Sequence, residues 1–396
     1  MITTGKILPT LVVGGGIGGL AAALAIARAG REVHLIEQAP EFTEIGAGLQ
    51  VGPNATRMLD RLGVLKQALD IAVLPTRGVM MDAVTGEQLT VLDLGEAFRD
   101  RYSYPYVVLH RGDLLDILLA ACAENPLVRL ENDKTVVDVW SEDDLAGVSC
   151  GDGSSYTTEL LVGADGINSR VRQLFDTSPP HHSGYVAYRG TLPIGEVTSE
   201  VSTDDVVLWI GPGMHLMQYP VRRSEIYNQV AVISTGQPVS ADQPGGSPEQ
   251  FRERFGRACD QVQRHVARIS TERRWPIFDR DPLDTWISGR AVLLGDAAHA
   301  MLQFLGQGSC QALEDAVTLA EQVSAGPSDL PAALAAYQDL RMDRTTRCQL
   351  SARPWGELWH TADPTVRALR DRVLRMRAAD DYSEVDWLYL DQFEAS

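Results

Sequence analysis

"LVVGGGIGGLAAALAIARAGREVHLIEQ", residues 11–38, decides the fold of this chain. Residues 7–13 predict a strand that Pro9 shortens or bends, residues 17–29 predict an alanine-rich helix, and residues 32–38 predict a second strand. Strand, glycine turn, helix and strand form a βαβ unit, in which the strands are parallel and the crossover is right-handed. The stretch therefore predicts an α/β protein with a Rossmann-like nucleotide-binding domain.

The glycines of this stretch form the pattern G-x-G-x-x-G at Gly14, Gly16 and Gly19. The first glycine permits a tight turn, the second lets backbone amides approach a pyrophosphate, and the third lets the helix pack close to the strand. The helix N-terminus adds partial positive charge for the phosphates. Glu37, at the end of the second strand, is placed to bind the ribose hydroxyls of an adenosine. An acid there disfavours a 2′-phosphate, so the site suits FAD or NAD better than NADP.

Two later segments also place an acid after an apolar strand. "GADGINSRVR" carries Asp165 and Gly166, a pair that is also common in simple turns. "LLGDAAHAMLQFLGQG" carries Asp296, which can reach the ribityl hydroxyls of a flavin. Gly306 and Gly308 then open a helix whose N-terminal amides can face the electron-rich edge of the flavin.

Composition sets limits on the class of protein. The chain has 396 residues, of which 44% are hydrophobic, and a formal net charge of −18, so a nucleic-acid partner is not expected. The five cysteines are scattered without a CxxC pattern, which argues against a metal site or a disulfide framework. We see neither a signal peptide nor an apolar run long enough for a membrane span, and expect a cytoplasmic protein.

The three motifs, in this order, resemble those of the single-component FAD-dependent aromatic hydroxylases, the group A flavoprotein monooxygenases. The Asp-Gly motif is accompanied by Ser169 and Arg172, and the Gly-Asp motif begins at Gly295. Arg111, in "VVLHRGDLLD", is similar to the arginine that lies near the flavin ribityl and phosphates in that family. Within the family, "GAGLQVGPNA", "GYVAYRG", "HLMQYP" and "PWGELWH" resemble the 3-hydroxybenzoate 6-hydroxylases. The resemblance covers nearly the whole chain.

The chain returns to the nucleotide-binding domain after an excursion into a second sheet. Short runs rich in β-branched and aromatic residues between residues 181 and 235 predict that sheet, and the chain is mostly helical from residue 308. We expect an FAD-binding domain in residues 1–75, 106–178 and 279–340, a substrate domain in 76–105 and 179–278, and a helical C-terminal region in 341–396. The aromatic tail "DYSEVDWLYLDQF" suggests a contact in a homodimer.

The resemblance implies FAD as cofactor, NADH or NADPH as reducing co-substrate, and O2 as the second substrate. It implies hydroxylation of a small aromatic acid through a flavin C4a-hydroperoxide, with the conversion of 3-hydroxybenzoate to 2,5-dihydroxybenzoate (gentisate) expected. The cofactor carries the difficult chemistry, and the protein positions the ring and excludes water.

His215 and Gln303 are the expected catalytic residues. His215 alternates with Met217 and Tyr219, which places the three side chains on one face of a strand. A phenol has a pKa of about 10, so a base must draw off its proton near neutral pH, and His215 is suited to that role although a histidine in a sheet is often a core residue. Gln303 stands where the family usually carries a proline, and it adds a side-chain amide beside the flavin and substrate.

Three further side chains are expected to contact the substrate. Tyr106 lies close in sequence to Arg111, Tyr219 shares the face of His215, and Gln50 is expected to face the isoalloxazine. For Tyr106, a place in an aromatic core is an equally reasonable interpretation.

Three alternatives remain open at this point. A salicylate or 6-hydroxynicotinate type of hydroxylase, which releases CO2, is compatible with the same spacing of His215 and Tyr219. An NAD-dependent dehydrogenase is disfavoured by the second and third motifs. A non-catalytic flavin-binding redox protein would bind FAD without substrate-stimulated NADH oxidation.

Overall fold

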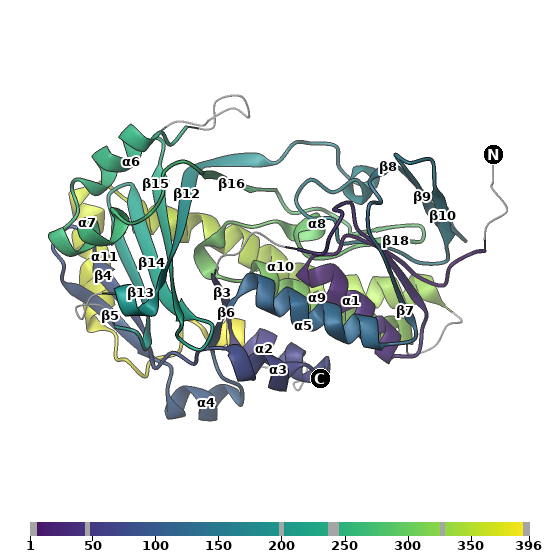
Figure 1. The fold of residues 1–396 in the computed structure, drawn as a ribbon, viewed down its shortest axis with the longest axis horizontal. Coiled ribbons are helices and arrows are strands. Elements are labelled where there is room, and N and C mark those ends of the chain that lie inside the picture. Colours follow the sequence, from purple (N-terminus) through teal and green to yellow (C-terminus); the bar gives the residue numbers. More distant parts are fainter. Residues whose placement is uncertain (1–5, 44–47, 198–201, 237–244, 325–328, 391–396) are drawn as a thin grey trace.

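The structure is a computed structural model that describes residues 6–43, 48–197, 202–236, 245–324 and 329–390. Two large sheets lie side by side in it, each at the centre of its own region (Figure 1). Helices from the second half of the chain join the two regions. The fold is therefore α/β, as the sequence predicts.

The first region is built on a six-stranded sheet that is parallel except for one edge strand. Its strands, in spatial order, are β17 (Ile287–Ser288), β18 (Ala291–Leu293), β11 (Leu161–Gly163), β1 (Leu11–Val13), β2 (Val33–Ile36) and β7 (Val128–Glu131). The segments that carry the three motifs leave β1, β11 and β18, which are neighbours in the sheet. Because parallel strands end at the same edge, the three motifs meet at one edge.

Helices cover one side of this sheet, and a small antiparallel sheet lies on the other (Figure 1). The helices are α1 (Ile17–Arg28), α5 (Arg111–Glu124), α9 (Gly308–Ser324) and the first part of α10 (Leu330–His360). The small sheet comprises β10 (Ser155–Thr158), β9 (Ala146–Cys150) and β8 (Val136–Ser141). Helix α1 is alanine-rich and buried along most of its length, which lets it pack closely between the sheet and α9.

The second region is a seven-stranded sheet. Its strands, in spatial order, are β16 (Trp275–Asp279), β12 (His181–Pro193), β15 (Ile226–Ser234), β14 (Met214–Val221), β13 (Asp205–Gly211), β4 (Arg77–Asp82) and β5 (Gln88–Asp93). The outer face is covered by α6 (Pro248–Phe255) and α7 (Asp260–Val266). The inner face is turned toward the first region. Strand residues alternate between the two faces, so Leu216 packs on the outer side and Met217 on the inner side.

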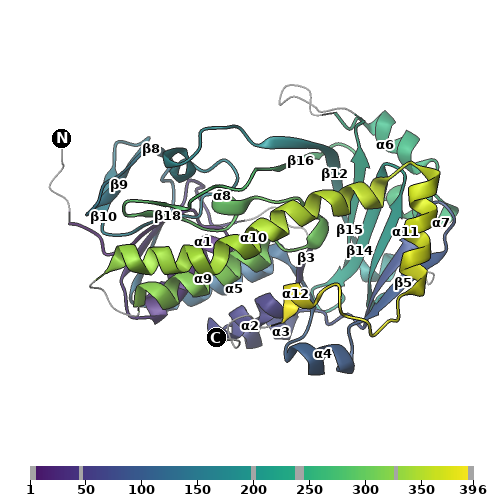
Figure 2. The ribbon, with the colours of Figure 1, turned by 180° about the vertical axis from the view of Figure 1, so that it is seen from behind.

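Shorter elements complete the fold. They are α2 (Pro53–Arg61), α3 (Leu65–Ile71), α4 (Glu96–Tyr102), the strand pair β3 (Gly48–Val51) and β6 (Val107–His110), α8 (Asp296–His299), and the 3₁₀ helices η1 (Val171–Leu174), η2 (Ile194–Glu196) and η3 (Gln303–Leu305). Helix α10 has 31 residues and extends from the first region to the second (Figure 2).

The C-terminal region continues with α11 (Pro364–Met376) and α12 (Asp386–Tyr389). The aromatic rings of Tyr382 and Tyr389 are buried in the chain's own core, where they meet Phe98 edge to face. The dimer contact expected of this tail is therefore not supplied by these rings, because intramolecular packing already covers them. A homodimer remains a prediction.

Two local features differ from the sequence prediction. The strand expected over residues 7–13 begins only at Leu11, because Pro9 cannot donate a ladder hydrogen bond; Leu8 forms an isolated bridge with Thr158. The sheet formed by β8, β9 and β10 was not predicted, since its short strands alternate only weakly between polar and apolar residues.

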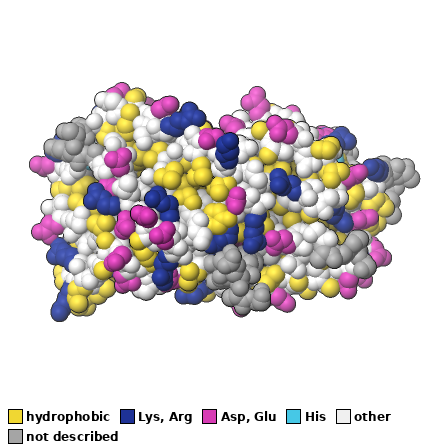
Figure 3. Space-filling model, turned by 90° about the horizontal axis from the view of Figure 1, so that it is seen from below, with side chains coloured by type: hydrophobic (Ala, Val, Ile, Leu, Met, Phe, Trp, Pro, Cys, Tyr) yellow, Lys and Arg dark blue, Asp and Glu magenta, His cyan; other side chains and the backbone are white. Residues whose placement is uncertain are grey.

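The surface carries charges of both signs. On the face seen in Figure 3, acidic and basic side chains are interspersed among hydrophobic ones. None of the helices that the structure describes has the length and apolar character needed to span a bilayer.

Candidate active site

The three motifs surround one cavity of about 480 Å³, here called the glycine-loop cavity. Its walls include the glycine turn after β1, Glu37, Asp165 and Asp296, together with Arg111 at the start of α5. Residues separated by nearly three hundred positions in the chain are thus brought to one edge of the parallel sheet.

Glycine is required at each of the three positions of the first motif, for a different structural reason in each case. Gly14 has φ of +109°, and a Cβ there would overlap the backbone of Ala164. A Cβ at Gly19 would overlap the carbonyl oxygen of Gly14, so this glycine lets α1 pack against the turn. A Cβ at Gly16 meets no atom within 4 Å, yet Gly16 lines the cavity. Gly16 is therefore a position where a side chain would collide with a ligand rather than with the protein.

Glu37 lies at the cavity wall after β2. Its carboxylate accepts hydrogen bonds from the backbone N–H of Gly15 at 2.6 Å and of Ala39 at 2.9 Å. The side chain therefore holds the glycine turn in place. Its role as a ribose ligand remains a prediction, and each carboxylate oxygen keeps a further lone pair for a hydroxyl donor.

The Asp-Gly motif is stabilised by hydrogen bonds within its own segment. Asp165 accepts from the hydroxyl of Ser169 and from the backbone N–H of Arg170 at 2.7 Å, and burial raises the pKa of its carboxyl. Arg172 is buried and donates to the carbonyl oxygens of Ala297 at 3.0 Å and Ala298 at 2.9 Å. This guanidinium ties the second motif to the third.

A second cavity, of about 210 Å³, adjoins the first and is here called the histidine cavity. Asp296, Arg111, Gly308 and Ser309 line both cavities. Helix α9 begins at Gly308, so its N-terminal amides lie at the junction, as the sequence predicts.

His215, Met217 and Tyr219 all line the histidine cavity from β14, in agreement with the alternation seen in the sequence. Gln303, at the start of η3, lines the same cavity. Burial raises the pKa of the Tyr219 phenol, so this side chain stays neutral near pH 7.

The imidazole of His215 is buried and paired with a second histidine that the sequence analysis did not consider. Its Nδ1 lies 2.8 Å from Nε2 of His360, and Nδ1 of His360 lies 2.6 Å from the carbonyl oxygen of Gly356. Burial lowers the pKa of His215 well below the usual value, with a further contribution from His360. Both rings are therefore neutral near pH 7.

Gln50 and Tyr106 are also brought together. The hydroxyl of Tyr106 donates to Oε1 of Gln50. Gln50 lines the histidine cavity, whereas Tyr106 lines an adjoining apolar cavity that also has a volume of about 210 Å³. Tyr106 therefore reaches the histidine cavity through Gln50, and a direct substrate contact for it remains a prediction.

Arg189 is a wall residue of the histidine cavity that the sequence analysis missed. It extends from β12, and its guanidinium lies 5.4 Å from the centre of the Trp275 ring. A cation at this wall gives the cavity an anchor for a carboxylate. The only sequence signal was an arginine within the β-rich stretch "GYVAYRG".

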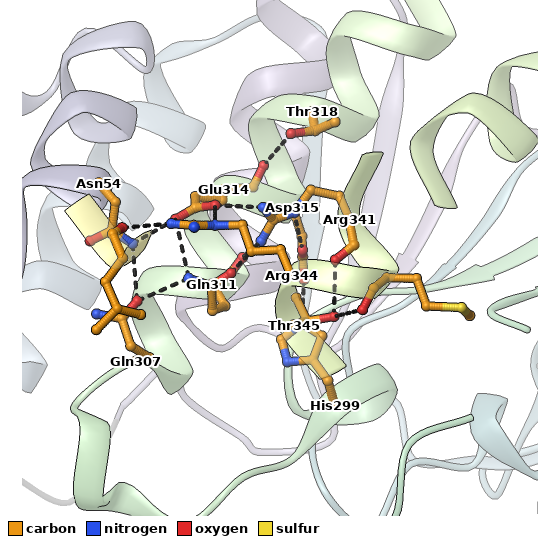
Figure 4. A network of polar contacts seen from close by, with 12 residues as sticks. Asn54, His299, Gln307, Gln311, Glu314, Asp315, Thr318, Arg341, Arg344 and Thr345 are labelled. Carbon is orange, nitrogen blue, oxygen red and sulfur yellow. Dashed lines mark hydrogen bonds and ion pairs between the residues drawn. The ribbon is translucent and has the colours of Figure 1, made fainter. Parts of the chain in front are cut away.

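A buried ionic network supports the third motif, the Gly-Asp motif that begins at Gly295 (Figure 4). The carboxylate of Asp315 lies 2.6 Å from Nε2 of His299, accepts from the Gly295 backbone N–H at 2.9 Å, and pairs with Arg341 at 2.8 Å. Glu314 pairs with Arg341 at 2.5 Å and is fully enclosed. The network fixes the Gly295 turn by charge-assisted hydrogen bonds that water cannot compete for.

Family membership follows from a comparison of the whole sequence. The family described as "FAD binding domain" matches residues 8–348, which include all three motifs. The chain belongs to the FAD-dependent aromatic hydroxylases. Its curated relatives include a 3-hydroxybenzoate 6-hydroxylase of Polaromonas naphthalenivorans, 38% identical over 96% of each chain. Another of the same name, from Klebsiella oxytoca, is 37% identical over 97% of each chain. The hydroxylase is thus of the 3-hydroxybenzoate 6-hydroxylase type.

A solved structure has the same architecture. Klebsiella pneumoniae HpxO, complexed with FAD and uric acid, aligns with a TM-score of 0.84, 26% identity and coverage of 96% of each chain. The glycine-loop cavity of the present hydroxylase also fits this cofactor, because Gly16 leaves open space and the first residues of α1 and α9 line the cavity. The residues that would hold FAD are those of the three motifs and Arg111.

Proposed function

We propose that this hydroxylase converts 3-hydroxybenzoate to 2,5-dihydroxybenzoate, consuming one NADH or NADPH, one proton and one O2 and releasing NAD(P)+ and water. The observation that carries the proposal is the histidine cavity, which adjoins the glycine-loop cavity and is lined by both His215 and Gln303. When bound, FAD takes reducing equivalents from the nicotinamide and activates O2 for transfer of one oxygen atom to the ring.

Two side chains of the chain are suited to the phenolic hydroxyl. Nε2 of neutral His215 accepts the hydroxyl proton from the sheet side, and Gln303 hydrogen-bonds the same oxygen from η3. Drawing the proton away raises electron density at the ring carbon para to the oxygen, which is the carbon that becomes hydroxylated. The phenolate that forms in a dry cavity in turn raises the pKa of His215, because opposite charges attract strongly where water is excluded.

The carboxylate of the substrate is suited to Arg189. The guanidinium lines the cavity and sits on the face of Trp275, which orients its plane. A carboxylate held there fixes the ring so that the phenol can point toward His215. Met217 supplies the apolar wall against which the ring packs.

The test measures product, hydrogen peroxide and NADH consumption with a panel of benzoates. The wild-type protein should oxidise NADH faster with 3-hydroxybenzoate and form 2,5-dihydroxybenzoate. His215→Ala and Gln303→Ala should each lose a charge-assisted hydrogen bond, about 1.5–3 kcal/mol, and slow hydroxylation roughly ten- to a hundredfold. Flavin reduction needs no phenolate, so NADH consumption should continue and peroxide should replace product.

A matched control is His181→Ala, which removes an exposed histidine from the far end of β12. This variant should stay coupled. If His215→Ala and Gln303→Ala also stay coupled at the wild-type rate, neither residue activates the phenol.

A decarboxylating hydroxylase is the second candidate, favoured by the presence of His215 and Tyr219 in the same cavity. It predicts catechol and CO2 from salicylate and no turnover of 3-hydroxybenzoate. Product identification separates the two. Bound FAD without substrate-stimulated NADH oxidation would instead indicate a redox protein.

We also propose that the protein is a homodimer. Helix α11 exposes Val366, Leu369, Val373 and Met376, which recur at helical spacing and so form one apolar face. A second copy covering this face would remove these side chains from water.

A further inference from the structure

The hydrogen bonds of the pair formed by His215 and His360 determine which nitrogen of each ring carries the proton. A carbonyl oxygen can only accept, so Nδ1 of His360 must carry a proton to bond the Gly356 oxygen at 2.6 Å. Neutral His360 then has its lone pair at Nε2. The 2.8 Å contact to Nδ1 of His215 therefore requires a proton on that Nδ1.

It follows that Nε2 of neutral His215 carries the lone pair. In the described part of the chain this nitrogen has no hydrogen-bond partner, and His215 lines the histidine cavity. We infer that His360 is a positioning residue which holds His215 in the Nδ1–H tautomer, so that its Nε2 can accept the proton of a phenolic substrate. This inference rests on the proposed function for its substrate, but the tautomer itself does not depend on that function.

His360 is held by contacts from several elements. It is the last residue of α10, and its carbonyl oxygen accepts from the backbone N–H of Gly213 at 2.9 Å, in the turn between β13 and β14. The Tyr185 ring lies 4.6 Å from its ring centre, and the Phe304 ring lies 5.6 Å away. The end of α10 is thus attached to the hairpin that carries His215, and the distance between the two histidines is set by backbone.

Phe304 links this pair to Gln303. Its ring packs edge to face against His215 at 5.7 Å and Trp359 at 5.5 Å. A Cβ at Gly356 would overlap the Phe304 ring, so glycine is needed there for the ring to reach the histidines. The same glycine therefore supplies the acceptor for His360 and the space for Phe304.

The state with both rings neutral is the one that the surroundings favour. Burial, together with the positive charge of Arg370, lowers the pKa of His360 to about 4, whereas the hydrogen bond to Gly356 raises it. The titratable or charged groups around the pair are Tyr185 on β12, Glu357 on α10, Arg370 on α11 and, at the cavity, Arg111, Arg189, Tyr219 and Asp296. With His360 uncharged, it acts as an acceptor for His215 across the neutral range.

Replacing His360 tests this directly. His360→Phe keeps an aromatic ring between Tyr185 and Phe304 but removes the acceptor. His360→Gln places an amide oxygen near the former Nε2 and so can still accept from Nδ1 of His215. Without an acceptor, a buried Nδ1–H is unsatisfied, and His215 should switch to the Nε2–H tautomer, which donates to the phenol instead of accepting from it.

The first readout is the tautomer of His215, measured by nitrogen-15 NMR of the FAD-loaded protein without substrate. The His215 signals are assigned by their loss in His215→Gln. Wild type and His360→Gln should show a protonated Nδ1 on His215, and His360→Phe should not. A protonated Nε2 on His215 of the wild type would overturn the inference.

The second readout is the ionisation of a bound probe, 3-hydroxy-4-nitrobenzoate, whose phenolate absorbs visible light. His360→Phe should raise the apparent pKa of the bound probe by about one unit or more, a tenfold loss of ionised probe, and His360→Gln should recover most of it. In the His215→Ala background, His360→Phe should add no further shift. Equal probe ionisation in wild type and His360→Phe would refute the role of His360.

Hydroxylation supplies the third readout and separates the two proposals. His360→Phe should lower the coupled rate ten- to a hundredfold with a smaller effect on KM. If wild type turns over no phenolic benzoate, the proposed function fails, whereas the tautomer measurement still decides the role of His360. Should His360→Phe fail to fold, a His215 without Nδ1–H in wild type or in His360→Gln would contradict the inference.

Discussion

Replacing Arg341 with methionine tests how the buried ionic network supports the cofactor region. Arg341 is fully enclosed and pairs with Glu314 at 2.5 Å and with Asp315 at 2.8 Å. Methionine fills much of the volume but leaves two carboxylates short of a cation. We expect a large loss in the free energy of unfolding, because a buried charge that loses its partner stays desolvated.

The magnitude follows from the partners that remain. Removing one member of a buried ion pair costs about 3–5 kcal/mol. Glu314 keeps Arg344 at 2.7 Å, and Asp315 keeps His299 at 2.6 Å, so the expected loss lies near the lower end, at about 3 kcal/mol. Because Asp315 also holds the Gly295 turn, FAD affinity should fall as well.

Urea unfolding followed by tryptophan fluorescence measures the stability, and FAD fluorescence measures the cofactor affinity. The matched control is Arg61→Met, which removes a half-exposed pair between α2 and Glu321 of α9 and should cost less than about 1 kcal/mol. Arg341→Lys should lie between the two. If Arg341→Met loses no more stability than Arg61→Met, the network does not support the region as described.

Three further outcomes are expected. Gly16→Val should fold but purify without FAD, whereas Gly19→Val should lower the thermal unfolding temperature because its side chain meets backbone; equal behaviour of the two would contradict this distinction. Burial raises the pKa values of Glu314 and Asp315, but their ion pairs with Arg341 and their other partners outweigh burial and lower both pKa values to about 2. The stabilisation of the fold by these ionised carboxylates is therefore complete above pH 4.5 and is lost as the pH falls toward 2. Acid unfolding of the wild type, monitored by circular dichroism, should show this loss of stability. Arg341→Met lacks the ion pairs and serves as the control, because it should not show the same loss. Leu369→Glu should shift a dimer toward monomer in analytical ultracentrifugation, and an unchanged sedimentation coefficient would exclude α11 from the interface.

Much of the fold and of the cofactor cavity could be predicted from the sequence, because the motifs have local causes. The βαβ unit around Gly14 and the acids after β11 and β18 follow from strand order and backbone geometry. The shared face of His215 and Tyr219 follows from the two-residue period of a strand. The resemblance to the aromatic hydroxylases depended on the same stretches.

The remaining site residues could not be predicted, because their roles come from contacts between distant elements. His360 gains its role only where the end of α10 meets the β13–β14 turn. Arg341 and Glu314 look like ordinary charged residues of exposed helices until the packing of α9 against α10 encloses them. The packing of Tyr389 within the chain could not be predicted for the same reason, since its partner Phe98 lies far away in sequence.

Helix α10 bears both Arg341 and His360, and this has a consequence for how the sequence can vary. The two residues are nineteen positions apart, which corresponds to about 28 Å along the helix axis. Inserting or deleting a single residue between them would turn His360 by about 100° and move it by about 1.5 Å relative to Arg341. Either the ionic network or the histidine pair would then be lost. The outer face of this segment can accept many substitutions, but its length is fixed, because one end supports the cofactor region and the other end positions the histidine pair at the substrate cavity.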